Sequence, residues 1–471
     1  DKKFNVYLNK TLSNTWVLIT AYSALSSEYH YLPANQPLQT FKLFCAREKE
    51  HEYHVYYGDG IFYILTNKNK AFNFKLMKVS ENKISKEKSN YPNSQWEELI
   101  THRPDVFIEG GEVFKEFIAL NIRKEGRQKI EIYNIKKSQL ETVDFKEDIY
   151  SVVLGHNAEY GSDFLRLSFE TPVKPLITYD YNWKEKKLHF KRQMKYAGDF
   201  SSENYKTESQ YALANNGVKI PLSLVYKKDL KITTKTPLLL YGYGSYGYSL
   251  DPRFNPYVLS LLNRGFIYAT AHIRGGSERG RLWYEEGKFL KKKNTFTDFI
   301  ACAEHLIEKS YSSPEHLYIM GESAGGLLMG AVLNERPDLF HGAVARVPFV
   351  DCLATMLDEH IPLTTGEYEE WGNPNEKAYY DYIKSYSPYN NIRKTNYPHL
   401  LIETGYHDPR VQYWEPVKWA AKLREYKTNN NLIAMTMNMD SGHFGSTGQF
   451  EYFKLYSLCY SFLIGLEQGL I

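Results

Sequence analysis

The pattern of apolar and polar positions changes about 205 residues into the chain. In residues 1–205, short apolar and aromatic runs alternate with turn formers, as in consecutive antiparallel strands. β-rich runs begin at Trp16, Ile61, Phe117 and Phe164, and the intervals of 45, 56 and 47 residues between them are typical of propeller blades. We therefore predict an incomplete all-β propeller domain of about four blades, with a β-sandwich of irregular strand spacing as the alternative.

Residues 206–471 follow a different pattern, in which strand-like and helix-like runs alternate to the end of the chain. Buried strands are predicted at 237–241 and 266–271, and a helix capped by Thr295 is predicted over 295–309. This alternation is typical of an α/β domain built on a largely parallel sheet.

A glycine-rich turn in the second domain carries a serine. The sequence Gly321-Glu322-Ser323-Ala324-Gly325-Gly326 follows a strand-like run at 317–320 and precedes a helix-like run at 327–333. Glycines on both sides of Ser323 allow the sharp turn of a nucleophile elbow, which exposes a hydroxyl at the carboxyl edge of a sheet. The pattern alone also occurs in ordinary loops, so its setting is what makes Ser323 a candidate nucleophile.

An acid and a histidine follow two later strand-like runs. Asp408 comes after the run 399–403 and His443 after the run 432–437, which is the Ser, Asp, His chain order of an α/β-hydrolase. A serine hydroxyl needs a base, and His443 would take its proton while Asp408 orients the imidazole. These three residues are the predicted catalytic triad.

An oxyanion hole needs two donors. The backbone N–H of Ala324, directly after the nucleophile, is the first candidate. The loop 241–247, with the sequence Tyr-Gly-Tyr-Gly-Ser-Tyr-Gly, follows a predicted strand, and its glycines allow a close approach of the backbone. A flexible surface loop is the alternative interpretation of this segment.

Composition narrows the function further. With 43% apolar and 24% charged residues, the 471-residue chain is globular and large enough for two cores. The net charge of +3 is spread along the chain and the run Lys291-Lys292-Lys293 is expected to be a solvated face, so we predict no nucleic-acid partner. Four cysteines without C-x-x-C spacing indicate neither a zinc site nor a disulfide framework, and the chemistry above requires no metal and no cofactor. The sequence has neither a membrane-spanning apolar stretch nor a signal-peptide pattern, so we expect a cytoplasmic protein without membrane contact.

The second domain resembles the prolyl oligopeptidase family of serine peptidases, and more closely its oligopeptidase B branch. The resemblance runs from about residue 205 to 469. Its motifs are Tyr241–Gly247, His272–Gly276, Gly287–Phe296, Val347–Asp351 and Ile361–Glu367. It implies an α/β-hydrolase fold, and it implies that the Tyr243 hydroxyl is the second oxyanion donor, with Tyr246 near the wall of the pocket for the P1 side chain.

An acidic segment bears on specificity. The segment 366–374 is bracketed by turn formers and is predicted to be a loop or an extended piece, in which Glu367 and Glu369 would face the same way. Two neighbouring carboxylates favour a basic side chain between them. The resemblance implies the same, because oligopeptidase B uses acids in this segment to cleave short peptides after Arg and Lys, whereas prolyl-specific relatives have an aromatic ring there. A solvated loop is the alternative.

The resemblance also suggests two further substrate contacts. Arg410 matches an arginine that is thought to bind a substrate carbonyl, with a structural salt bridge as the alternative. Asp251 matches the first of two acids associated with basic P2 residues, but Arg253 occupies the position of the second acid. A preference for dibasic sites is therefore left open.

The family architecture implied here is a seven-bladed propeller that caps the hydrolase domain, so about three blades and an N-terminal segment have no counterpart in this sequence. We expect either a missing N-terminal segment or a naturally shortened chain, and exposed blade edges would also favour a homo-oligomer. The rival functions are a prolyl-specific peptidase or an esterase on the same scaffold, and a catalytically inactive propeller scaffold.

Overall fold

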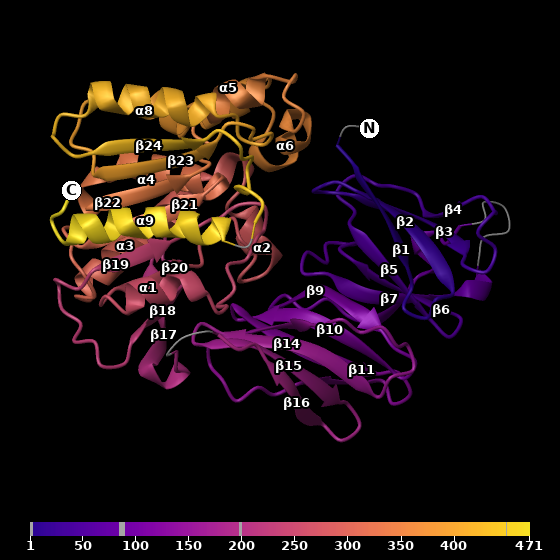
Figure 1. Ribbon diagram of the computed structural model, residues 1–471. Coiled ribbons are helices and arrows are strands. Elements are labelled where there is room, and N and C mark those ends of the chain that lie inside the picture. Colours follow the sequence, from indigo (N-terminus) through magenta and orange to yellow (C-terminus); the bar gives the residue numbers. More distant parts are fainter. Residues whose placement is uncertain (1–2, 84–89, 197–199, 449) are drawn as a thin grey trace. The chain divides into compact units, whose positions relative to one another are not determined.

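The structure, a computed structural model, describes residues 3–83, 90–196, 200–448 and 450–471 (Figure 1). The chain divides into two compact units. The first comprises Asp1–Tyr196 and Arg279–Leu282, and the second comprises Ala197–Glu278 and Trp283–Ile471.

The first unit contains four antiparallel sheets of four strands each, and every sheet is formed by consecutive strands. Their strands are β1 (Asn5–Lys10), β2 (Trp16–Tyr22), β3 (Ser27–Pro33) and β4 (Lys42–Cys45); β5 (Tyr53–Gly58), β6 (Ile61–Thr66), β7 (Lys75–Ser80) and β8 (Glu97–Ile100); β9 (Val106–Val113), β10 (Phe117–Lys124), β11 (Arg127–Asn134) and β12 (Gln139–Thr142); and β13 (Ser151–Leu154), β14 (Phe164–Thr171), β15 (Lys174–Asn182) and β16 (Lys187–Gln193). The four runs that define the sequence period are β2, β6, β10 and β14, which is the second strand of each sheet. The prediction of four blade-like sheets is confirmed.

The cores of this unit lie between consecutive sheets and are rich in aromatic side chains. One core joins β2–β4 to β5–β7 and contains the buried rings of Tyr31, Phe44 and Phe62. Further cores join the second sheet to the third and the third sheet to the fourth. The second and third sheets therefore pack against a neighbour on both faces, and the first and fourth sheets pack on one face, as in a stack of blades.

The second unit is built on an eight-stranded sheet in the order β17-β18-β20-β19-β21-β22-β23-β24. Its strands are β17 (Tyr205–Leu213), β18 (Lys219–Lys227), β19 (Leu238–Tyr241), β20 (Ile267–Ala271), β21 (Leu317–Glu322), β22 (Gly342–Arg346), β23 (His399–Gly405) and β24 (Ile433–Asn438). β18 pairs antiparallel with β17 and β20, and the other neighbours pair in parallel. The predicted α/β-hydrolase sheet is confirmed.

Helices connect these strands. The α-helices among the described residues are α1 (Leu259–Leu262), α2 (Arg281–Glu285), α3 (Lys293–Glu308), α4 (Ala324–Glu335), α5 (Cys352–Leu357), α6 (Thr364–Trp371), α7 (Lys377–Lys384), α8 (Trp414–Tyr426) and α9 (Glu451–Glu467). The 3₁₀ turns are η1 (Glu81–Lys83), η2 (Asn93–Gln95), η3 (Ser202–Asn204), η4 (Pro256–Val258), η5 (Phe289–Lys291), η6 (Pro337–Leu339) and η7 (Pro388–Asn391). None of the helices in the described parts of the chain is long and apolar enough to cross a membrane.

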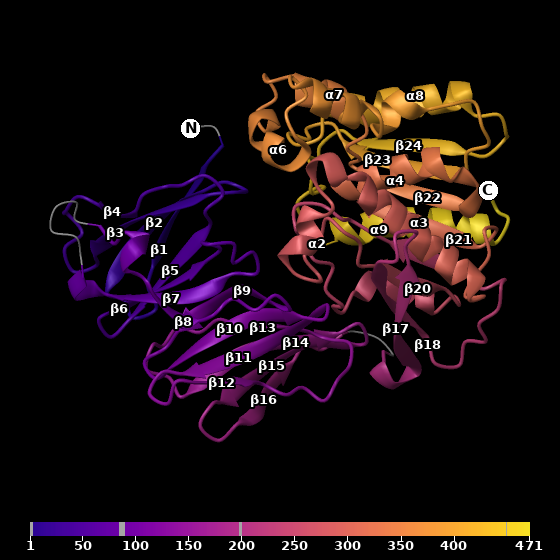
Figure 2. The same ribbon diagram turned by 180° about the vertical axis from the view of Figure 1, so that it is seen from behind.

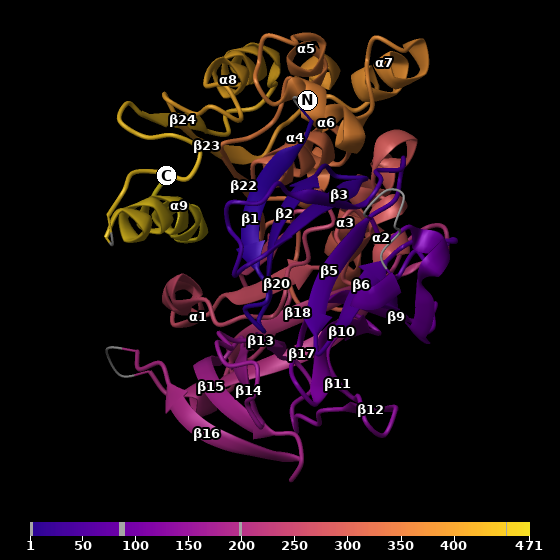
Figure 3. The same ribbon diagram turned by 90° about the vertical axis from the view of Figure 1, so that its right-hand side faces the viewer.

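The sheet of the second unit is covered on both faces. Along β19, Leu238 and Leu240 pack in the core formed with α3, α4 and α8, while Leu239 packs in the core formed with α1 and α9. The views from behind and from the side show α4 and α9 on opposite faces of β22 and β23 (Figures 2 and 3). Burial of both faces explains why these strands are continuous apolar runs.

One detail of this unit differs from the prediction. Thr295 does not cap α3, because the helix begins at Lys293 and the side chain of Thr295 is fully buried. Its hydroxyl donates instead to the carbonyl of Arg274 at 2.8 Å. A tertiary hydrogen bond has therefore replaced the local capping interaction.

Candidate active site

The turn at Ser323 has the strained backbone of a nucleophile elbow. β21 ends at Glu322 and α4 begins at Ala324, while Ser323 between them has φ 55° and ψ −116°. A Cβ added to Gly321 would lie 2.3 Å from the carbonyl oxygen of Gly325, so the turn leaves no room for a side chain there. The predicted strand-turn-helix is confirmed, and it exposes Ser323 at the carboxyl edge of the parallel strands.

Asp408 and His443 lie in the loops that follow β23 and β24, at the same edge of the sheet. His443 Nδ1 is 2.7 Å from Asp408 Oδ2. The other oxygen, Asp408 Oδ1, accepts the backbone N–H groups of Arg410 at 2.8 Å and Val411 at 2.9 Å. An ionised carboxylate only accepts hydrogen bonds, so His443 donates from Nδ1 and its Nε2 is left to accept a proton.

A cavity of about 800 Å³ brings most of the predicted residues together. Those that line it are Ser323, His443, Tyr243, Ala324, Tyr246, Glu367 and Arg410. Asp408 is buried against the ring of His443, behind the lining. The described lining includes neither Glu369 nor Asp251.

Both candidate oxyanion donors are in this lining. Burial, followed by the carboxylates of Glu370 and Glu367, raises the pKa of the Tyr243 hydroxyl, so that it remains a protonated donor at neutral pH. Ala324 is the first residue of α4, and the first N–H groups of a helix have no partner within the helix. These N–H groups also carry the positive end of the helix dipole, which favours an oxyanion.

The acid pair differs from the prediction. The segment at Glu367 is not a loop but helix α6, in which residues two positions apart are about 200° apart around the axis. Glu367 and Glu369 therefore face different ways, and the pairing expected from an extended chain is wrong. Glu370, three positions after Glu367, lies on its side of the helix and is buried, whereas Glu367 is half-buried.

Glu367 and Glu370 have separate hydrogen-bond donors, except that both accept from Tyr246. Glu367 Oε2 accepts from the hydroxyl of Tyr246 at 2.7 Å and from the indole N–H of Trp371 at 2.9 Å. Glu370 Oε1 accepts the backbone N–H of Tyr246 at 2.8 Å, and its Oε2 accepts from the hydroxyl of Tyr284. Burial raises the pKa of Glu367 above its usual range, and the neighbouring Glu370 adds to the rise.

The two remaining predicted contacts are in different settings. Arg410 lies at the cavity with its guanidinium 4.9 Å above the ring of Phe444, and no ion pair holds it within the described residues. The side chain of Asp251 is largely buried, and its Oδ2 lies 3.9 Å from the guanidinium of Arg253. Arg253 therefore stands beside Asp251 as a counter-charge.

Two profiles of one family match most of the chain. The profile of the prolyl oligopeptidase family matches residues 252–467, and the profile of the prolyl oligopeptidase N-terminal β-propeller domain matches residues 1–194. The chain belongs to the prolyl oligopeptidase family. The family resemblance indicated by the sequence motifs is thus confirmed.

Relatives of this prolyl oligopeptidase family member are similar over nearly all of its length. It is 39% identical over 465 residues to dipeptidyl aminopeptidase BI of Pseudoxanthomonas mexicana and 37% identical over 464 residues to protease 2 of Moraxella lacunata. These alignments cover 98% of the chain, but only 63% and 66% of the two relatives. The chain therefore spans less than two thirds of the length of either relative.

Two solved structures of oligopeptidase B have the same fold. The chain superimposes with a TM-score of 0.94 and 39% identity on the enzyme from Leishmania major and on the enzyme from Trypanosoma brucei with covalently bound antipain. The match covers 100% and 99% of this chain, and 66% of each of those chains.

Sequence reasoning missed two residues of the site in this family member. Glu370 was overlooked because the sequence of α6 has turn formers and no apolar period that would indicate a helix. Lys292 was expected on a solvated face, but its side chain is only 1% exposed and lies beneath the cavity loop. The solvated-face prediction is wrong for this lysine, whereas its neighbour Lys291 is exposed.

Proposed function

We propose that this chain is a serine oligopeptidase that hydrolyses short peptides on the carboxyl side of Arg or Lys through an acyl-enzyme. The observation that carries the proposal is the composition of one cavity. Ser323, His443 and the half-buried acid Glu367 line it together, and Asp408 holds the imidazole from behind. The proposed nucleophile Ser323, the proposed base His443 and the proposed recognition group Glu367 thus line the same cavity.

The reaction follows from these positions. His443 Nε2 takes the hydroxyl proton as Ser323 Oγ bonds to the scissile carbonyl carbon, and the carbonyl oxygen becomes an oxyanion held by Tyr243 and the Ala324 amide. The C–N bond then breaks, and the proton on His443 passes to the leaving amine. Water repeats the sequence on the acyl-enzyme and releases Ser323. The family's covalent chemistry supports this proposal, because the Trypanosoma brucei oligopeptidase B structure contains covalently bound antipain.

The preference for a basic P1 residue rests on Glu367. Its Oε2 is engaged by Tyr246 and Trp371, which leaves Oε1 for a guanidinium or ammonium that enters the cavity. A charge-assisted hydrogen bond of this kind is roughly twice as strong as a neutral one. Arg410 would bind a substrate carbonyl and Tyr246 would form the pocket wall.

A second candidate activity comes from one relative. Dipeptidyl aminopeptidase BI, at 39% identity, is named for removing dipeptides from a free amino terminus. That activity would use the same triad but would require a free N-terminus two residues from the cleaved bond. An N-terminally blocked substrate distinguishes it from endopeptidase cleavage.

The test is hydrolysis of short fluorogenic peptides with Arg, Lys, Pro or Phe at P1, each with a blocked and a free N-terminus, with Ser323→Ala as the blank. We expect blocked Arg and Lys peptides to be cleaved at least tenfold faster than Pro and Phe peptides. Faster cleavage after Pro would refute the P1 assignment, and cleavage of unblocked peptides alone would support the dipeptidyl activity. Activity on simple esters without peptide cleavage would support an esterase, and a folded but unreactive chain would support the scaffold interpretation.

A further inference from the structure

Lys292 is a buried cation beneath the wall of the active-site cavity. It immediately precedes α3, and its ammonium donates to the carbonyl of Gly244 at 2.6 Å and to the hydroxyl of Ser245 at 2.7 Å. It also lies 5.1 Å from the ring centroid of Trp371. A buried ammonium carries a large desolvation cost, so its hydrogen bonds and neighbouring charges have to offset that cost.

The residues that Lys292 holds belong to the loop of the candidate oxyanion donor. Gly244 and Ser245 lie directly after Tyr243 and directly before Tyr246, and both tyrosines line the cavity. Gly244 has φ 71°, a left-handed backbone conformation that glycine adopts readily, and its carbonyl accepts from the Lys292 ammonium. Lys292 supplies two of the hydrogen bonds that hold this loop.

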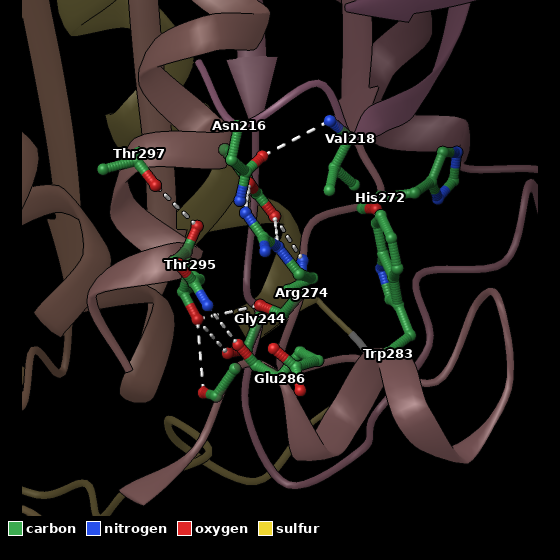
Figure 4. A network of polar contacts seen from close by, with 12 residues as sticks. Asn216, Val218, Gly244, His272, Arg274, Trp283, Glu286, Thr295 and Thr297 are labelled. Atoms are coloured by element: carbon green, nitrogen blue, oxygen red, sulfur yellow. Dashed lines mark hydrogen bonds and ion pairs between the residues drawn. The ribbon is translucent and has the colours of Figure 1, made fainter. Parts of the chain in front are cut away.

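Two other residues also form hydrogen bonds to this loop, namely Thr295 and Gly275. Figure 4 shows Thr295 against Gly244 and Arg274; its hydroxyl is 3.4 Å from the Gly244 carbonyl. The N–H of Gly247 donates to the carbonyl of Gly275 at 2.9 Å. The contact of the Thr295 hydroxyl with the Gly244 carbonyl is long for a hydrogen bond. The Lys292 ammonium, at 2.6 Å, is therefore the stronger donor to the Gly244 carbonyl.

The charge of Lys292 also has a counterpart. Glu370 on α6 is buried and accepts the backbone N–H of Tyr246. Burial lowers the pKa of Lys292 to about 8, while Glu370 on α6 and the Cys352 thiol on α5 act in the opposite direction. Glu370 therefore favours the charged form of Lys292, and the two side chains hold opposite ends of the segment 244–246.

We propose that Lys292 is a positioning residue for the oxyanion hole, whose ammonium fixes the Gly244–Ser245 segment so that the Tyr243 hydroxyl meets the developing oxyanion. The proposal rests on the proposed function of the site. Because Tyr243 acts in the transition state, a loosened loop lowers kcat more than it raises KM. A lysine that only stabilises the fold would lower the amount of folded protein and leave the kcat of that fraction unchanged.

The experiment compares Lys292→Met, which removes the charge and leaves an unbranched side chain of similar length, with Lys291→Met at the exposed neighbour. On a blocked P1 Arg peptide, we expect kcat of Lys292→Met to fall at least tenfold with KM within threefold, while Lys291→Met stays within twofold of the unmodified chain. When Tyr243→Phe is already present, adding Lys292→Met should lower kcat by less than a further twofold, because the hydroxyl that Lys292 positions is absent. The proposal would be overturned if the losses in kcat of the two substitutions were additive, or if Lys292→Met raised KM without lowering kcat.

A second variant and a second readout keep the test decisive. If Lys292→Met does not fold, Ser245→Ala removes one of the two hydrogen bonds, and a smaller loss that also disappears with Tyr243→Phe is expected. The rate of Ser323 phosphonylation by a small phosphonate, followed by intact mass, requires no peptide specificity. Labelling without P1 Arg cleavage refutes the proposed function alone, and a tenfold slower labelling of Lys292→Met still supports this inference. Equal labelling rates, or no labelling of the unmodified chain, refute it.

Discussion

The role of Glu367 can be tested by Glu367→Gln, which removes one charge and keeps the size of the side chain. In the structure, Oε2 already accepts two hydrogen bonds, and Glu367 is part of the cavity lining. The loss is therefore one charge-assisted hydrogen bond between Oε1 and the P1 cation, worth about 1.5–3 kcal/mol. Since about 1.4 kcal/mol is a factor of ten, we expect kcat/KM for a P1 Arg peptide to fall roughly 10- to 150-fold.

The matched control is Glu369→Gln. This substitution makes the same chemical change on the same helix, two residues away and outside the described lining of the cavity. We expect it to change kcat/KM by less than twofold. A P1 Phe peptide serves as the second control, because Glu367→Gln should leave its kcat/KM within about threefold. Equal losses for Arg and Phe peptides, or a larger loss with Glu369→Gln, would refute the assignment of the P1 pocket.

The same residue predicts a pH dependence. Burial raises the pKa of Glu367, so its carboxylate is ionised above that raised pKa and protonated below it. The preference for Arg over Phe should therefore be full at high pH and should decrease as pH falls through the raised pKa. The ratio of the two kcat/KM values, rather than either value alone, cancels the pH effects that both substrates share. A ratio that is flat with pH, or one that rises as pH falls, would contradict the role of an ionised Glu367.

Three further predictions follow from the geometry. Asp408→Asn should lower kcat by roughly 10⁴-fold, the loss typical when a triad acid can no longer hold the histidine tautomer, with the fold unchanged by circular dichroism; a loss below tenfold would argue against the triad. Gly321→Ala should lower the free energy of unfolding, measured in urea titrations, by about 1–3 kcal/mol, because the added Cβ would lie 2.3 Å from the Gly325 carbonyl oxygen. Gly366→Ala is the control: its added Cβ would have nothing within 4 Å, so this variant should not be destabilised. Activity should decrease as pH rises through about 8, where the Lys292 ammonium loses its proton, and Lys292→Arg should move that decrease to higher pH if the variant folds.

Most of the fold can be predicted from local patterns in the sequence. The intervals between β2, β6, β10 and β14 mark the four sheets, because every sheet is made of consecutive strands and repeats the same connection. The elbow at Ser323 was equally predictable, since a strand, two flanking glycines and a helix are contiguous in the chain. Features of this kind depend on neighbours in sequence, so they can be predicted without tertiary information.

The chain order of the three predicted triad residues was also present in the sequence, but the approach of Asp408 to His443 was not. Asp408 and His443 approach to 2.7 Å because β23 and β24 are parallel neighbours whose carboxyl ends lie at one edge of the sheet. The order of residues along the chain predicts this only once an α/β-hydrolase sheet is assumed.

The surroundings of the candidate specificity residues were decided by the tertiary structure. Whether Glu369 or Glu370 joins Glu367 depends on whether the segment is extended or helical, and α6 has no apolar period that would reveal its helix. Likewise, the sequence shows three consecutive lysines, and only packing against Gly244 and Trp371 buries Lys292 while Lys291 remains exposed. The sequence by itself determined the elements and the candidate nucleophile, because these depend on local chemistry. The tertiary structure decided which charges are buried together, because that depends on contacts between residues far apart in the chain.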